Sequence, residues 1–131
     1  MSRYIFVVCF LFKLLRSYSI SAQSAVSVKA QSDINASRDA GIAKINAGLA
    51  AALIITTCDA TATGIVKSTA SAAIQEIKNK ASAAIDVIVA LNQAVDQPIK
   101  DQAATTTAAI NDAAQVAVTA MSGAAGTAAK C

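Results

Sequence analysis

The feature that most constrains this chain is a large apolar residue that returns every eleven positions. The recurring residues are Ile55, Val66, Ile77, Ile88, Ile99, Ile110 and Met121. Three helical turns of about 3.67 residues span eleven positions, so these side chains stay on one face of a nearly straight helix. Alanines fill the intermediate positions of that face, at Ala70, Ala73, Ala81, Ala84, Ala103, Ala114 and Ala117. The recurrence therefore predicts long helices with a narrow apolar stripe.

Composition favours the same fold class. Alanine is the commonest residue after position 20, and it is the best helix former and a poor strand former. An earlier stretch also has helical spacing, with one face formed by Ile34, Ile42, Ile45, Leu49, Ala50, Ala52 and Leu53. The chain is short enough for one domain. We predict an all-α, alanine-rich domain over residues 23–122.

Three sets of residues mark breaks between helices. The segment from Asp59 to Gly64 combines a capping acid, threonines and a glycine, which together favour a turn. Asp96 as N-cap with Pro98 in the first turn marks a helix start, and Gly123 marks an end. These breaks predict helices over 25–58, 65–95 and 98–122, followed by a flexible C-terminal tail over 123–131.

Short connections make neighbouring helices antiparallel, so we predict a three-helix antiparallel bundle. The phase of the eleven-residue repeat also runs across the breaks at Gly64 and Pro98. A long bent helix, or loosely packed helices that associate with copies of themselves, is therefore an alternative. In the bundle, Cys58 and Cys131 close the first and third helices at the same pole, which makes them a disulfide candidate.

Residues 1–22 have the pattern of a secretory signal peptide. A short basic start precedes the apolar run YIFVVCFLF at 4–12, and small residues follow. The run is shorter than the roughly 20 residues that span a bilayer. We predict export from the cell, where Asn35-Ala36-Ser37 is a candidate N-glycosylation site. A mitochondrial presequence is the alternative, because no acidic residue precedes Asp33.

Residue types exclude most kinds of chemistry. The chain has no histidine and no tryptophan, so a cysteine nucleophile lacks its usual base and zinc lacks a ligand set. Beyond the targeting segment, eight basic and eight acidic residues are interspersed along the chain, whereas nucleic-acid binding needs a basic face. We expect no enzymatic activity, catalytic residue, metal, cofactor, small-molecule substrate or nucleic-acid partner.

Two functions fit these patterns best. The first is a small secreted protein that acts through protein interaction or self-association, or as a structural component of an extracellular fluid. The alternative is a helical protein that binds lipid surfaces, since apolar stripes of period eleven also suit interfacial helices.

The composition and the period also resemble the alanine-rich antifreeze proteins of fish, which implies ice binding as a further alternative. Those proteins repeat threonine at the eleven-residue positions. Here no threonine stands eleven residues after another, as Thr56, Thr57, Thr61, Thr63, Thr69, Thr105, Thr106 and Thr107 illustrate. The repeated residue is isoleucine, which favours a core position.

Overall fold

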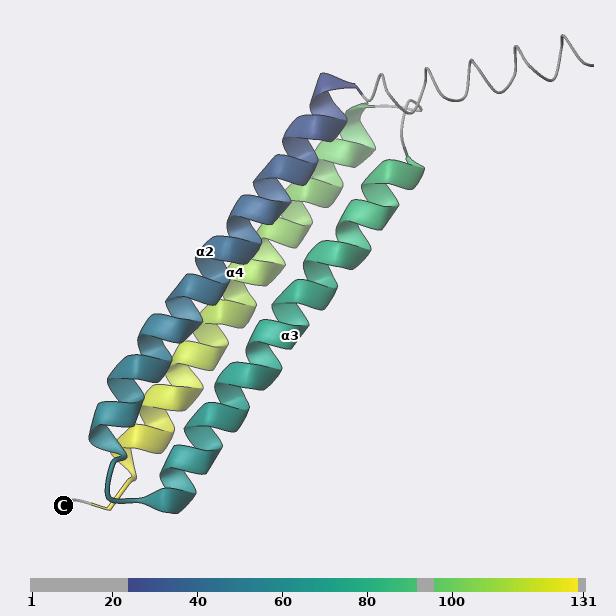
Figure 1. Cartoon of the computed structure of the whole chain (residues 1–131). Helices are drawn as coiled ribbons and strands as arrows, with labels where there is room; N and C mark the ends of the chain where they lie inside the picture. Colours follow the sequence, from purple (N-terminus) through teal and green to yellow (C-terminus); the bar gives the residue numbers. More distant parts are fainter. Residues whose placement is uncertain (1–23, 92–95, 130–131) are drawn as a thin grey trace, which may run out of the picture.

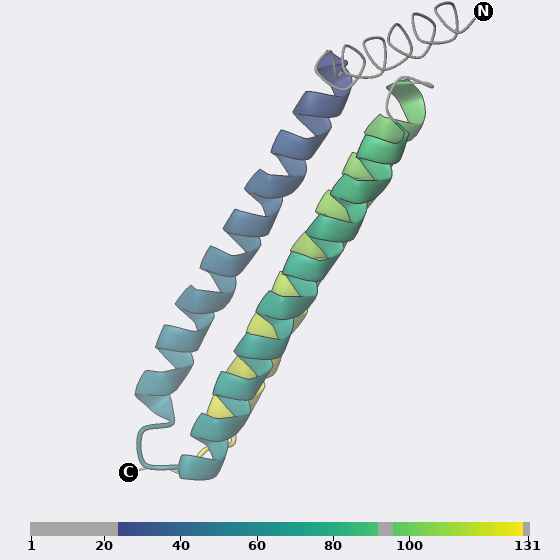
Figure 2. The same ribbon diagram turned by 45° about the vertical axis from the view of Figure 1, so that its right-hand side comes forward.

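The computed structural model describes residues 24–91 and 96–129. Within them the protein is all-helical, as predicted, and consists of three helices that pack against one another, each of 31 residues: α2 (Ala25–Ile55), α3 (Ala60–Ala90) and α4 (Asp96–Gly126). The ribbon descends along α2, returns along α3 and descends again along α4 (Figure 1). All three are nearly straight rods (Figure 2). The predicted targeting peptide, residues 1–22, lies outside the described residues.

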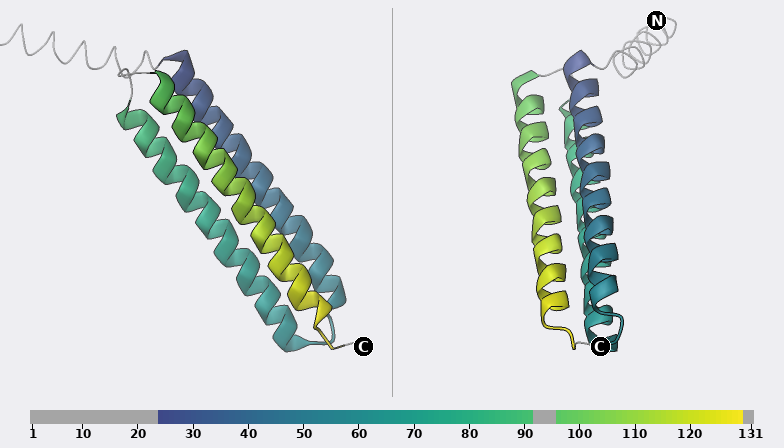
Figure 3. Two further views of the ribbon diagram at one scale, coloured as in Figure 1. Left: turned by 180° about the vertical axis from the view of Figure 1, so that it is seen from behind. Right: turned by 90° about the vertical axis from the view of Figure 1, so that its left-hand side faces the viewer.

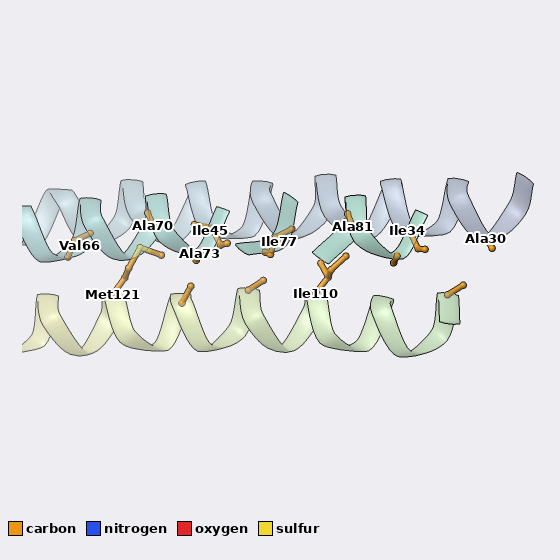
Figure 4. Packing of buried hydrophobic residues seen from close by; sticks show 14 of the residues in the cluster. Ala30, Ile34, Ile45, Val66, Ala70, Ala73, Ile77, Ala81, Ile110 and Met121 are labelled. Atoms are coloured by element: carbon orange, nitrogen blue, oxygen red, sulfur yellow. The ribbon is translucent and has the colours of Figure 1, made fainter. Parts of the chain in front are cut away.

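The eleven-residue stripe forms the core on α3 and α4. Its large members there are almost completely buried: Val66, Ile77, Ile88, Ile99, Ile110 and Met121. The seven alanines predicted to fill the same face are buried too. Figure 4 shows Ile110 and Met121 pointing from α4 toward the side chains of the other two helices. The period therefore identified the buried face of both helices correctly.

The prediction for Ile55 is wrong, because its side chain is 58% exposed. The buried large residues of α2 are Ile34 and Ile45, and the next position in their phase is Thr56, which is also buried. The step from Thr56 to Val66 is ten residues, since the turn between the helices restarts the repeat. Ala52 is buried as predicted, whereas Ala50 is exposed.

The first turn lies earlier than the predicted 59–64. Helix α2 ends at Ile55, not residue 58, and α3 already begins at Ala60. Asp59 caps α3, since its Oδ1 accepts a hydrogen bond from the Ala62 backbone N–H at 3.0 Å. An N-cap residue immediately precedes the first residue of its helix, so the helix capped by Asp59 begins at Ala60. Gly64 therefore lies within α3 and not in a turn.

The other helix ends also differ from the predicted bounds. Helix α3 ends at Ala90 instead of residue 95, and α4 begins at Asp96, which lies in its first turn together with Pro98. At the other end α4 continues to Gly126, although residues 123–131 were predicted as a flexible tail. Glycine costs a helix only about 1 kcal/mol, and the burial of Ala125 favours this last turn.

Two glycines bring α2 close to α4. A Cβ atom on Gly41 would lie 3.2 Å from Ile110 Cγ2, and one on Gly48 would lie 3.2 Å from Met121 Cε. Lys44 Nζ also donates to Gln115 Oε1 of α4 at 2.6 Å. Figure 3 shows α2 and α4 running side by side along their length. Small residues at the contact therefore set the spacing of α2 and α4.

Candidate functional site: inter-helix furrows and the turn pole

No group of three or more His, Cys, Asp or Glu residues that could hold a metal ion occurs in residues 24–91 and 96–129. None of the helices in these ranges has the length and apolar character needed to cross a membrane. The features that remain for analysis are the pole where α2 turns into α3, and the furrows between the helices.

Asp59 joins two parts of the chain at the turn pole. While Oδ1 caps α3, Oδ2 accepts a hydrogen bond from the backbone N–H of Ala129 at 2.9 Å, seventy positions along the chain. The hydrogen bond from Ala129, followed by that from Ala62, lowers the pKa of the Asp59 carboxyl below the ordinary value. Both bonds favour the ionised form. The segment after α4 is thus held against the turn before α3.

Cys58 lies next to this carboxylate, in the exposed part of the turn. Ala129 stands two residues before Cys131, so the hydrogen bond from Ala129 to Asp59 brings the C-terminal segment to the neighbourhood of Cys58. Cys131 lies outside the described residues. The pairing of Cys58 with Cys131 stays a prediction.

Thr56 is a polar member of the core that the sequence reading did not single out. Its side chain is buried, and Thr63 Oγ1 lies 2.8 Å from its backbone oxygen and 3.1 Å from its Oγ1. These contacts satisfy polar atoms that burial would otherwise leave unpaired. The signal that could have identified it is its distance of eleven residues from Ile45.

Asn35, the predicted glycosylation site, lies on α2 and is partly buried. Its Oδ1 accepts a hydrogen bond from Arg38 Nη1 at 3.1 Å, and Arg38 also forms an ion pair with Asp39 at 3.0 Å. Glycosylation of Asn35 stays a prediction.

Furrows run between the helices because alanine leaves space where larger side chains would close the surface. One lies between α2 and α4 and has a volume of about 810 Å³. Five alanines are among its twelve lining residues, while Lys29 and Lys100 stand on its opposite walls and Asp33 forms an ion pair with Lys29 at 2.8 Å. Two cations thus flank an apolar floor.

A second furrow, the α3–α4 furrow, consists of two adjoining hollows of about 680 and 260 Å³. Both hollows are lined by Lys80 and Ala109, so they are continuous. Its walls carry two exposed valines, Val87 at 42% and Val116 at 68%. A third hollow of about 520 Å³ lies between α2 and α3, beside Arg38 and Lys78.

Charged residues occupy the middle of the α3–α4 furrow. Lys80 Nζ lies 3.3 Å from Glu76 Oε1, and Asp112 lines the α4 wall. The α3–α4 furrow therefore has charged residues at its centre, and alanine, valine, serine, threonine and glutamine residues toward its ends.

Comparisons with protein-family models, curated proteins and solved structures find no match to this chain.

Proposed function

We propose that this chain is a small secreted, non-enzymatic helical protein that acts by binding other protein surfaces, including copies of itself, or as a structural component of an extracellular fluid. The observation that carries the proposal is the α3–α4 furrow, where Val87 and Val116 remain exposed beside an alanine floor. Exposed apolar surface of this kind favours protein contacts. The nearly balanced charge beyond residue 22 does not oppose association.

The mature form in this proposal is an antiparallel three-helix bundle closed by a disulfide between Cys58 and Cys131. Two observations support the bundle: Gly41 faces Ile110 while Gly48 faces Met121, so numbers rise together on α2 and α4, and Thr56 contacts Thr63 across the α2–α3 turn. The disulfide is supported by the hydrogen bond that holds Ala129 at Asp59. Secretion supplies the oxidising conditions that such a bond needs.

Mass spectrometry of the protein purified from its natural source tests these points together. The denatured, non-reduced protein is expected to begin near residue 23 and to weigh about 2 Da less than its fully reduced form. Native spectra are expected to contain a complex with another protein chain or with a second copy. Retention of residues 1–22, together with free thiols and no protein complex, would contradict the proposal.

Lipid-surface binding is a second candidate, and the α2–α4 furrow favours it. Lys29 and Lys100 flank an apolar floor there, an arrangement that suits a lipid with an anionic headgroup. Flotation with vesicles of phosphatidylserine and phosphatidylcholine tests the idea. We expect Lys100→Gln to weaken flotation and Lys67→Gln, outside the furrow, to leave it unchanged; absence of wild-type flotation would eliminate this candidate.

A further inference from the structure

We propose that Asp59 is a positioning residue for the oxidation of this chain. The hydrogen bond that it accepts from Ala129 holds the C-terminal segment at the turn pole, so that Cys131 meets Cys58 once the three helices have packed. This inference rests on the disulfide of the proposed function, and it specifies how the formation of that bond is directed.

The two oxygens of the Asp59 carboxylate bind two different parts of the chain. Oδ1 accepts from the Ala62 backbone N–H at 3.0 Å, and Oδ2 accepts from the Ala129 backbone N–H at 2.9 Å. The first bond is local, because the two residues are three positions apart. The second joins residues seventy positions apart, so it forms only when α4 lies in place beside the turn. Bonds from backbone N–H to an ionised carboxylate are stronger than those between neutral groups.

The segment that follows α4 is hydrogen-bonded residue by residue up to this point. The backbone N–H groups of Thr127 and Ala128 donate to carbonyl oxygens in the last turn of α4, at 3.2 and 3.3 Å. The next N–H, that of Ala129, donates to Asp59. In Figure 1 the yellow segment after α4 lies beside the turn between α2 and α3. The direction of the chain is therefore set to within two residues of Cys131.

This hydrogen bond restricts the distance between the two cysteines. Consecutive Cα atoms are about 3.8 Å apart, so the Cα of Cys131 lies at most about 7.6 Å from that of Ala129, and Cys58 directly precedes Asp59. A disulfide needs Cα atoms about 4.4–6.8 Å apart. Without the bond to Asp59 the segment is held only by the end of α4. The effective concentration of one thiol at the other falls as the free segment between them lengthens.

The oxidation that Asp59 directs is a thiol–disulfide exchange with a disulfide oxidant such as oxidised glutathione. One protein thiolate attacks the oxidant, releases one glutathione thiolate and forms a mixed disulfide. The second protein thiolate then attacks the protein sulfur of the mixed disulfide and releases the other glutathione. The two protein thiols lose two electrons and two protons, and one oxidised glutathione becomes two reduced molecules. The hydrogen bond from Ala129 to Asp59 favours the second exchange, because that step requires the two protein sulfurs to meet.

Equilibration of the full-length protein with mixtures of reduced and oxidised glutathione tests the role of Asp59. Peptide mapping after the thiols are blocked measures the fraction of chains with a Cys58–Cys131 bond, which gives the effective concentration of the two thiols. We expect Asp59→Ser to lower this concentration at least about threefold. Serine still caps a helix, but its single side-chain oxygen replaces two, so it does not hold Ala129 as well.

A change at Ala129 removes the same hydrogen bond from the other side. Ala129→Pro eliminates the backbone N–H and leaves the Asp59 carboxylate and its cap of α3 unchanged. We expect it to lower the effective concentration at least about threefold as well. Ala129→Ser is the matched control, because it keeps the N–H, and it is expected to keep the wild-type value. Helicity by circular dichroism identifies a variant that fails to fold; if Ala129→Pro does, Asp59→Ser decides.

Three results would overturn this role of Asp59. They are a wild type that forms no Cys58–Cys131 bond in any glutathione mixture, wild-type effective concentrations in both Asp59→Ser and Ala129→Pro, and an equal loss in Ala129→Ser. The first result also contradicts the disulfide of the proposed function. The other two leave that bond in place and contradict only the positioning by Asp59, so the two failures are distinguishable.

Discussion

Gly41 of α2 lies so close to Ile110 of α4 that a Cβ atom on the glycine would be 3.2 Å from Ile110 Cγ2. The same atom would lie 3.2 Å from Ile77 Cδ1 of α3. One missing methyl group thus lets all three helices meet in the middle of the core. By contrast, a Cβ on Gly64 of α3 would meet nothing within 4 Å.

This difference predicts opposite effects for one substitution at the two positions. Gly64→Ala is expected to raise the free energy of unfolding by about 0.5–1 kcal/mol, because alanine is the better helix former and has free space there. Gly41→Ala is expected to lower it by about 1 kcal/mol, because overpacking typically costs about 1–3 kcal/mol and exceeds the gain in helix propensity. Urea unfolding followed by circular dichroism measures both, and equal stabilisation at the two positions would contradict the close approach.

The sequence predicted those parts of the fold that depend on local spacing. The buried faces of α3 and α4 follow from the eleven-residue period, which needs only the geometry of one helix. Gly41 could also have been placed in the core, since it stands eleven residues from both Ala30 and Ala52, and both alanines are buried. The exposure of Ile55 could not be predicted in this way, because it depends on where the turn interrupts the phase.

The candidate site was less accessible to sequence reasoning, because it depends on contacts between distant residues. Asp59 was recognised as a capping acid, but its second hydrogen bond reaches Ala129, seventy positions away. The α3–α4 furrow depends likewise on which positions of α3 and α4 stand side by side. Helical spacing within one segment does not specify either relationship.

The proposed disulfide predicts a large effect of reduction. A bond between Cys58 and Cys131 closes a loop of about seventy residues, which stabilises by about 4 kcal/mol in the chain-entropy account. We expect reduction, or the double change Cys58→Ser with Cys131→Ser, to lower Tm by more than 10 °C. Calorimetry with and without reductant measures the shift. An unchanged Tm on reduction would contradict the bond.

Asp59 predicts a loss of stability in acid. Its pKa in the folded protein lies below the ordinary value of 3.8, so its contribution is complete above that value and disappears as the pH falls through the lower, folded-state pKa. We expect Asp59→Asn to lower Tm at pH 7, and the difference from wild type to shrink as the pH falls below 3.8. Asp86→Asn on the exposed face of α3 serves as control. If the difference in Tm between Asp59→Asn and wild type stayed constant as the pH fell, the ionised carboxylate of Asp59 would be excluded as the source of that difference.

The restart of the repeat at the first turn predicts unequal roles for isoleucines that share one phase in the sequence. Ile110→Ala removes a buried side chain and is expected to lower the free energy of unfolding by about 2–5 kcal/mol, because the cavity adds to the lost transfer energy. Ile55→Ala removes a side chain that is 58% exposed and is expected to change it by less than about 0.5 kcal/mol. Urea unfolding of the two variants decides whether the repeat is interrupted between Thr56 and Val66 or runs unbroken through Ile55. Equal losses at both positions would mean that Ile55 packs in the core, and the turn at 56–59 would then be misplaced.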